Sequence, residues 1–149
     1  MMRAILFDCD STLSTIEGID VLAELAGVVD QVVPLTNAAM EGRLKLEEAY
    51  AARLDLIKPD ASTIDAVGRQ YIETRVDGAA EAIAALGALG WQVHVVSGGI
   101  RQAVLAIARF LGVPDERVHA VDLRFDANGH YAGFDPESPL ARSGGKAEI

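Results

Sequence analysis

The chain has 149 residues, which is the length of about one domain and is enough to bury a sizeable core. Its 13 basic and 22 acidic residues give a formal net charge of −9, which argues against a general binder of nucleic acid or of anionic membranes, because phosphate groups would repel it. The hydrophobic content of 50% excludes a largely disordered chain, and no apolar stretch reaches the ~20 residues that span a bilayer.

The amino-terminal sequence and the cysteine content predict a cytoplasmic protein. The apolar run at residues 4–7 is too short for the apolar region of a secretory signal. Cys9 is the single cysteine, so no intrachain disulfide can form and an oxidising compartment would not help the fold. We therefore expect an acidic cytoplasmic enzyme that acts on a small molecule, with neither a nucleic-acid nor a membrane partner.

The first predicted elements are a strand and a group of helices. Residues 4–7 form a continuous apolar run, which is typical of a strand buried on both faces of a parallel sheet. Apolar residues at spacings of three and four predict a helix over 16–26, which Gly27 ends. Two further helices are predicted over 46–57 and 64–74.

The next part of the chain alternates helices and strands. An alanine-rich helix is predicted over 79–89, with Asp77 as its capping residue. A strand over 91–96 follows, and the Ser-Gly-Gly sequence of 97–99 is expected to end it. Amphipathic spacing then predicts a helix over 100–111.

The last predicted elements are a strand over 117–121 and a hairpin over 123–134. Asn128 and Gly129 lie between short apolar and aromatic segments, a pattern typical of a hairpin with a type I′ turn. The segment 143–149 indicates a loop and the start of a helix.

Alternating strands and helices predict an α/β fold, a Rossmann-like parallel sheet with helices on both faces. The helices between the first two strands are too many for one crossover. We therefore expect a small helical cap at 15–75, inserted into a core formed by 1–14 and 76–149.

Two segments fall where open parallel sheets bind ligands, beyond the carboxyl ends of strands. Asp8 and Asp10 can hold a hard divalent cation, or act as nucleophile and general acid/base; alternatively, they cap backbone amides in a polar turn. Ser97, Gly98 and Gly99 can present backbone N–H groups to an anion at a helix start. A Gly-Gly turn is also common where no ligand binds.

Two basic residues are further candidates. Lys146 follows Gly144 and Gly145, and a lone lysine of this kind is most often a solvated surface charge. Arg53 falls on the apolar stripe of the helix predicted over 46–57, where an unpaired buried charge is costly. It therefore either extends to water or binds an anion held under the cap.

Together, these segments resemble the haloacid dehalogenase superfamily of phosphatases, in both order and context. The resemblance is carried by Leu-Phe-Asp-Cys-Asp-Ser-Thr at 6–12, Val-Val-Ser-Gly-Gly at 95–99 and Gly-Lys-Ala at 145–147. Residues 8–20, with Met-Glu-Gly at 40–42 and the arginine in the helix that follows, are similar to phosphoserine phosphatases. The resemblance implies hydrolysis of O-phosphoserine to serine and phosphate through an aspartyl phosphate, with Mg²⁺ as cofactor.

The resemblance also implies a role for each candidate residue. Asp8 would be the nucleophile and Asp10 the general acid and base, and both would bind Mg²⁺, Asp8 through its carboxylate and Asp10 through its backbone carbonyl. Glu17 and Arg53 would recognise the amino and carboxylate groups of the substrate. The other substrate-binding residues would be Met40 and Gly42 in the closed pocket, and Ser97, Gly98, Gly99 and Lys146 at the phosphoryl group. We interpret Cys9 as a packing residue.

The sequence departs from the resemblance at its end. Family members continue past the lysine into a further strand and a Gly-Asp-Gly-x-x-Asp loop with another magnesium ligand, whereas only 147–149 follow Lys146 here. We therefore expect a fragment of a longer protein or a catalytically inert relative.

Two alternative functions stay open: a phosphatase for another small phosphomonoester, and an inert fold that binds phosphate-like anions or a protein. Because the strands flanking 4–7 on one side are missing, we also expect an open sheet edge there, through which copies of the chain can self-associate.

Overall fold

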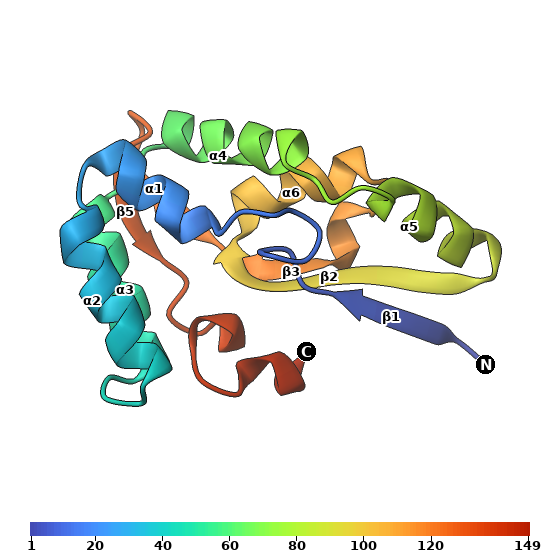
Figure 1. Ribbon diagram of the computed structural model, residues 1–149, viewed down its shortest axis with the longest axis horizontal. Helices are drawn as coiled ribbons and strands as arrows, with labels where there is room; N and C mark the ends of the chain where they lie inside the picture. Colours follow the sequence, from blue (N-terminus) through green and yellow to red (C-terminus); the bar gives the residue numbers. More distant parts are fainter.

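A three-stranded parallel sheet lies at the centre of the computed structural model, which describes residues 1–149 (Figure 1). Its strands are β1 (Arg3–Phe7), β2 (Trp91–Ile100) and β3 (Val118–Val121), in the spatial order β1-β2-β3. A separate antiparallel pair consists of β4 (Leu123–Phe125) and β5 (Tyr131–Phe134). The predicted α/β class with a parallel sheet and a hairpin is confirmed.

The fold also contains six α-helices and three short 3₁₀ helices. The α-helices are α1 (Gly18–Ala26), α2 (Val29–Met40), α3 (Leu46–Ile57), α4 (Ala61–Glu73), α5 (Ala79–Ala88) and α6 (Arg101–Phe110). The 3₁₀ helices are η1 (Asp115–Arg117), η2 (Pro139–Ala141) and η3 (Gly145–Glu148). None of the helices combines the length and the apolar character needed to cross a membrane.

Helices α4, α5 and α6 lie on one side of the sheet, rather than on both sides as predicted (Figure 1). The two crossovers, from β1 to β2 and from β2 to β3, step across the sheet in the same direction. Because such crossovers are right-handed, their helices pack on the same face. A continuous core of 29 buried residues joins this face and its helices to the buried residues of α1, α2 and α3.

Strand β1 forms an edge of the sheet, because it pairs with β2 alone. Leu6 is 57% exposed and Ala4 is also exposed, so the prediction of a strand buried on both faces is wrong. The prediction of an open edge at this strand is confirmed. The apolar run therefore leaves backbone groups and apolar side chains accessible, as is typical of a surface that pairs with another segment.

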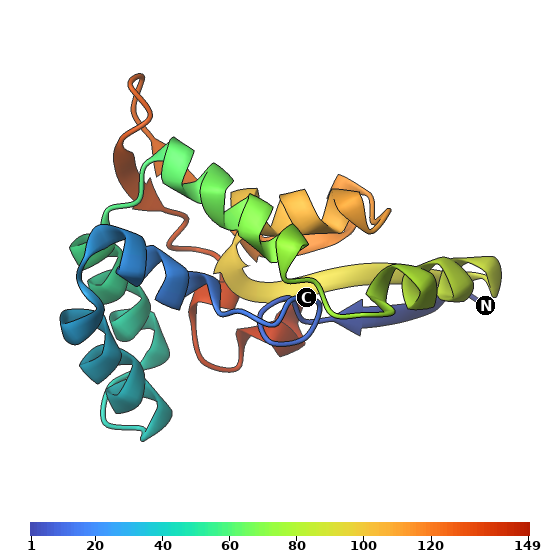
Figure 2. The same ribbon diagram turned by 45° about the horizontal axis from the view of Figure 1, so that its top comes forward.

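Helices α1 to α4 form an insertion between β1 and α5, and the two ends of this insertion lie side by side. An isolated antiparallel bridge joins Ser14 to Arg75, and the Val76 amide donates to the Leu13 carbonyl at 2.9 Å. Helices α1, α2 and α3 gather beyond the carboxyl ends of the strands, whereas α4 runs alongside α6 (Figure 2). Gly68 permits this approach, because a Cβ there would lie 2.9 Å from Ala106.

Helix α2 was not predicted from the sequence. It contains Pro34, which lacks the N–H needed for a helical hydrogen bond, and this residue obscures the helical pattern. Its only buried residue is Val32, so the segment carries no regular apolar stripe.

Two local predictions are wrong for reasons of backbone geometry. Helix α5 begins after Gly78, whose φ of 83° ends the preceding turn, and no side chain caps the helix, so Asp77 does not act as a cap. A type I′ turn requires a positive φ at both of its central residues. In the β4–β5 loop, Gly129 has a φ of 79°, but the φ of Asn128 is not positive. The Asp126 carboxylate instead accepts from the amides of Asn128 and His130, at 2.8 and 3.0 Å, and stabilises a longer loop.

Candidate active site

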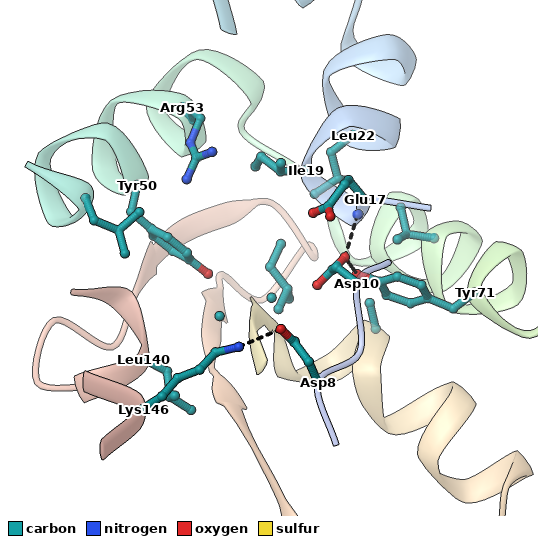
Figure 3. Close-up of a pocket in the computed structure, with 17 residues that line it drawn as sticks. Asp8, Asp10, Glu17, Ile19, Leu22, Tyr50, Arg53, Tyr71, Leu140 and Lys146 are labelled. Carbon is teal, nitrogen blue, oxygen red and sulfur yellow. Dashed lines mark hydrogen bonds and ion pairs between the residues drawn. The ribbon is translucent and has the colours of Figure 1, made fainter. Parts of the chain in front are cut away.

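A cavity of about 250 Å³ opens at the carboxyl ends of β1 and β2, on the side where α1 and α3 lie (Figure 3). Three acidic side chains line it, those of Asp8, Asp10 and Glu17, together with two basic ones, Arg53 and Lys146. The sheet thus brings together residues that are up to 138 positions apart in the chain. This is the place where open parallel sheets bind ligands.

Asp8 lies directly after β1, and donors occupy both of its carboxylate oxygens. The ammonium group of Lys146 donates to Oδ2 at 2.6 Å, and the backbone amide of Cys9 donates to Oδ1 at 2.8 Å. The Cys9 side chain is fully buried, and burial raises the pKa of its thiol, so Cys9 is a packing residue as interpreted. Charge-assisted hydrogen bonds of this kind hold the Asp8 carboxylate in one orientation.

Asp10 is held by three different elements. The backbone amide of Gly18, at the start of α1, donates to Oδ1 at 2.7 Å. The hydroxyl of Tyr71, from α4, donates to the same oxygen at 2.5 Å. Ser97, from β2, donates to Oδ2 at 3.3 Å. The Asp10 carboxylate therefore occupies a fixed position at the meeting point of the insertion and the sheet.

The Ser97-Gly98-Gly99 segment belongs to β2, which continues to Ile100, so the expected end of the strand at residue 96 is wrong. The pairing register with β3 shifts between Val96 and Ile100, and this irregularity bends the strand toward the start of α6. Ser97 is fully buried, and its Oγ accepts the Gly99 amide at 2.9 Å. Gly98 and Gly99 line the cavity, whereas Ser97 lies behind them.

The glycines of this segment leave room for the acidic group. A Cβ at Gly99 would lie 3.0 Å from Oδ2 of Asp10, which is closer than nearly all real contacts of this kind. A larger residue at this position would therefore push against the Asp10 carboxylate and the Ser97 hydroxyl, which lies equally close.

Lys146 reaches Asp8 from η3, and two glycines make this placement possible. Gly144 has a φ of 73°, a region that side chains disfavour. Gly145 packs so closely on the Pro139 carbonyl that no Cβ fits there. The side chain of Lys146 is 53% exposed but ion-paired, which favours a role in the cavity over that of an ordinary surface lysine.

Arg53 is 8% exposed and lines the cavity from α3. Its guanidinium group donates to the Ala49 carbonyl and the Thr36 hydroxyl, both at 3.2 Å, and lies 5.9 Å from the centre of the Tyr50 ring. Burial lowers the pKa of Arg53, and no carboxylate lies within ion-pair distance. A buried cation without an anionic partner favours the binding of an anion.

Glu17 precedes α1 and accepts a hydrogen bond from the Ser11 hydroxyl at 2.6 Å. Burial raises the pKa of Glu17, and the nearby charges of Asp10, Asp20 and Asp8 act in the same direction. A cationic ligand group beside this carboxylate would offset that repulsion.

Comparison with known proteins identifies the family to which this arrangement belongs. Residues 2–138 match the family model of haloacid dehalogenase-like hydrolases. The chain belongs to this family.

The chloroplastic phosphoserine phosphatase of Arabidopsis thaliana is 40% identical over 99% of this chain and 50% of its own length. A substrate-bound phosphoserine phosphatase complex is 32% identical with a TM-score of 0.81, over 100% of this chain and 69% of that one. A phospho-aspartyl intermediate analogue of phosphoserine phosphatase is 39% identical with a TM-score of 0.70, over 87% of this chain and 60% of that one. The chain thus spans about half the length of the Arabidopsis relative.

Two of the expected site residues of this haloacid dehalogenase-like hydrolase lie away from the cavity. Met40 is 83% exposed at the end of α2, and neither Met40 nor Gly42 lines the cavity. Met40 is the last residue of α2, and Gly42 lies in the connection to α3, which turns back at the outer end of these helices (Figure 1). Gly42 supplies the positive φ of 72° that this reversal uses.

Tyr71 was missed by the sequence interpretation, although a signal was present. It follows Ile64 and Val67 on the buried face of α4, which favours an apolar packing role. A buried tyrosine hydroxyl, however, normally requires a hydrogen-bond partner. The sequence could not show that this partner is Asp10, 61 residues away.

The oxygen donors of the site fit a hard divalent cation. The main-chain carbonyl of Asp10 accepts no backbone hydrogen bond, and Asp8 contributes a carboxylate beside it. No cluster of three or more metal-ligating side chains is present. Because Mg²⁺ uses one or two carboxylates and completes its shell with water and phosphate oxygens, the donor set matches a cation bound together with a phosphorylated substrate.

Proposed function

We propose that the protein hydrolyses O-phosphoserine to serine and phosphate, with Asp8 as the nucleophile. The observation that carries this proposal is the convergence of Asp8, Asp10 and Lys146 in one cavity, opposite a buried Arg53 without an anionic partner. Relatives that are phosphoserine phosphatases support the choice of substrate.

The reaction proceeds in two steps, which form and then hydrolyse a phosphorylated Asp8. In the first step, a carboxylate oxygen of Asp8 bonds to phosphorus, the bond from phosphorus to the serine oxygen breaks, and Asp10 gives that oxygen a proton. In the second step, a water molecule attacks phosphorus and gives a proton to Asp10, and the bond to Asp8 breaks. Phosphate is released, and both carboxyl groups return to their starting states.

Phosphoryl transfer depends mainly on positioning and charge stabilisation. Lys146 neutralises charge shared by Asp8 and the phosphoryl group, and the backbone at Gly98 and Gly99 lies next to the phosphoryl oxygens. The Asp8 carboxylate and the Asp10 carbonyl would hold Mg²⁺, which when bound supplies positive charge to the phosphoryl oxygens.

Recognition of the amino acid uses the insertion. Arg53 binds the substrate carboxylate, which gives its buried guanidinium group an anionic partner. Glu17 binds the ammonium group, which offsets the repulsion among the neighbouring carboxylates. We propose that residues 15–75 form a cap over the core made by 1–14 and 76–149, and the bridge between Ser14 and Arg75 supports boundaries near these positions.

Cytoplasmic localisation and self-association through β1 stay predictions. The exposed Leu6 and the unpaired edge of β1 support self-association.

Phosphate release from a panel of substrates tests the function. We expect Mg²⁺-dependent turnover of O-phosphoserine that exceeds turnover of glycerol phosphate and p-nitrophenyl phosphate, and none in Asp8→Asn, because its neutral amide is a poor nucleophile. Equal or faster turnover of the other esters would instead indicate a phosphatase for another small phosphomonoester. Phosphate binding without turnover of any ester would indicate an inert anion-binding fold.

A further inference from the structure

The hydroxyl of Tyr71 contacts Asp10 but takes no part in the two proposed reaction steps. Tyr71 is 1% exposed, and its hydroxyl donates to Oδ1 of Asp10 at 2.5 Å. The Gly18 amide donates to the same oxygen at 2.7 Å. Figure 3 shows the Tyr71 hydroxyl beside one oxygen of Asp10, while the second oxygen, Oδ2, points into the cavity.

The surrounding backbone leaves a slot that fits this phenol. A Cβ at Gly18 would collide with the Tyr71 hydroxyl, and one at Gly99 would lie 3.5 Å from it. The glycines come from α1 and β2, and the tyrosine comes from α4. Residues of three elements therefore meet around this one hydroxyl group.

The surroundings of the Tyr71 hydroxyl favour its protonated form. Burial raises the pKa of Tyr71, and the charge of Asp10 raises it further. The phenol therefore acts as the hydrogen-bond donor toward Oδ1 of Asp10, as the contact geometry shows.

The two oxygens of Asp10 are consequently not equivalent. Oδ1 accepts two fixed donors, so a proton placed on it would disrupt two hydrogen bonds. Oδ2 has a single, longer contact with Ser97, at 3.3 Å, and faces the cavity. The proton that Asp10 exchanges is thus favoured on Oδ2.

We propose that Tyr71 is a positioning residue, which holds Asp10 so that Oδ1 accepts hydrogen bonds and Oδ2 carries the proton passed between leaving group and water. This inference rests on the proposed function for the direction of proton transfer. The contact itself can be tested in the protein without turnover.

Nuclear magnetic resonance tests the contact directly. We expect a slowly exchanging, downfield hydroxyl proton of Tyr71 that is absent in Tyr71→Phe, unchanged in Tyr131→Phe, and shifted upfield in Asp10→Asn. The Hα–Hβ couplings of Asp10 should report one rotamer in the wild type and averaging in Tyr71→Phe. A Tyr71 hydroxyl proton that does not respond to Asp10→Asn, or unchanged Asp10 couplings in Tyr71→Phe, would overturn the proposal.

Kinetics then separate positioning from packing. We expect Tyr71→Phe to lower kcat for O-phosphoserine by roughly 10- to 100-fold, the effect of one hydrogen bond to a charged group, with KM nearly unchanged. The loss should be smaller for p-nitrophenyl phosphate, because nitrophenolate leaves without needing a proton. An equal loss on both substrates with a lowered melting temperature would show a merely structural role and overturn the proposal.

The two hypotheses fail in different ways. A wild-type protein without turnover of any ester contradicts the proposed function, and the resonance measurements then decide the role of Tyr71 by themselves. Tyr131→Phe is the matched control because Tyr131 lies on β5, outside the cavity lining, and loses the same hydroxyl group.

Discussion

The cavity has a sheet side and an insertion side, and the two differ in how many of their charged groups have hydrogen-bond or ion-pair partners within the protein. On the sheet side, Asp8 and Asp10 each accept hydrogen bonds on both oxygens, and Lys146 is paired with Asp8. On the insertion side, Arg53 has only neutral partners, and the pKa of Glu17 is raised by burial and by neighbouring carboxylates. The sheet side is preorganised for chemistry, whereas the insertion side lacks the charges that a ligand would bring.

This difference separates reactivity from selectivity. Groups that are already fixed around the reacting atoms contribute to every phosphoryl transfer, whatever the leaving group. Charged groups that have no oppositely charged partner in the protein contribute to binding only when a substrate carries the complementary charge. A phosphate monoester of an amino acid with free carboxylate and ammonium groups would supply both an anion for Arg53 and a cation for Glu17.

Removal of Lys146 should give the largest effect and should not depend on the substrate. Loss of one preorganised charge-stabilising donor typically costs 10²- to 10³-fold in rate, so we expect Lys146→Ala to slow all phosphomonoesters by about that factor. Steady-state phosphate release measures this, with Lys45→Ala as the control because Lys45 is exposed and does not line the cavity. A loss confined to O-phosphoserine would contradict the division between the two sides.

Removal of Arg53 should give a smaller effect that depends on the substrate. A hydrogen-bonded charge contributes about 1.5–3 kcal/mol, so Arg53→Ala should lower kcat/KM for O-phosphoserine by roughly 10- to 150-fold. Turnover of p-nitrophenyl phosphate should change little, because that ester has no carboxylate. Arg69→Ala is the matched control, since Arg69 is exposed on α4. An equal loss of kcat/KM on both esters would show that Arg53 contributes to folding or to the chemical step rather than to recognition of the substrate carboxylate.

The sequence predicted the sheet side of the cavity better than the insertion side. Asp8, Asp10 and the Ser97 segment follow apolar strands, and strand ends in parallel sheets converge whatever the loops do. Lys146 follows no strand, and its place beside Asp8 was implied by the family resemblance rather than by the spacing of residues. The structure brings it there through the close packing of Gly145 on Pro139.

The insertion was less predictable because its contacts depend on how helices pack. Arg53 was recognised from its position on an apolar stripe, which is a local property of α3. Met40 lies away from the cavity and Tyr71 lies in it, and neither placement follows from helical spacing. The direction of each helix is set by long-range contacts such as the packing of Gly68 against α6, which no local pattern reveals.

Helix α4 belongs to the insertion and contacts the sheet side through Tyr71. Its N-cap residue, Asp60, offers the mildest test of whether the two sides of the cavity act independently. The Asp60 carboxylate accepts from the Thr63 amide and hydroxyl, both at 2.7 Å, and from the Ser62 hydroxyl, at 2.8 Å. These hydrogen bonds lower the pKa of Asp60 from 3.8 to about 2. Because the folded state has the lower pKa, the cap stabilises the protein fully above pH 3.8 and loses this effect as pH falls toward about 2.

We therefore expect Asp60→Ala to lower the melting temperature near pH 7 by roughly 2–4 °C, and this difference should vanish near pH 2. Asp60→Asn is the matched control, since asparagine also caps helices but has no carboxylate to titrate. Turnover at 25 °C should stay unchanged in both variants, because Tyr71 reaches Asp10 from the opposite end of α4. Thermal denaturation across pH, together with kcat, measures both outcomes. A fall in kcat in Asp60→Ala at a temperature where the protein remains folded would show that the helix start and Asp10 are coupled, and that the two sides of the cavity are not independent.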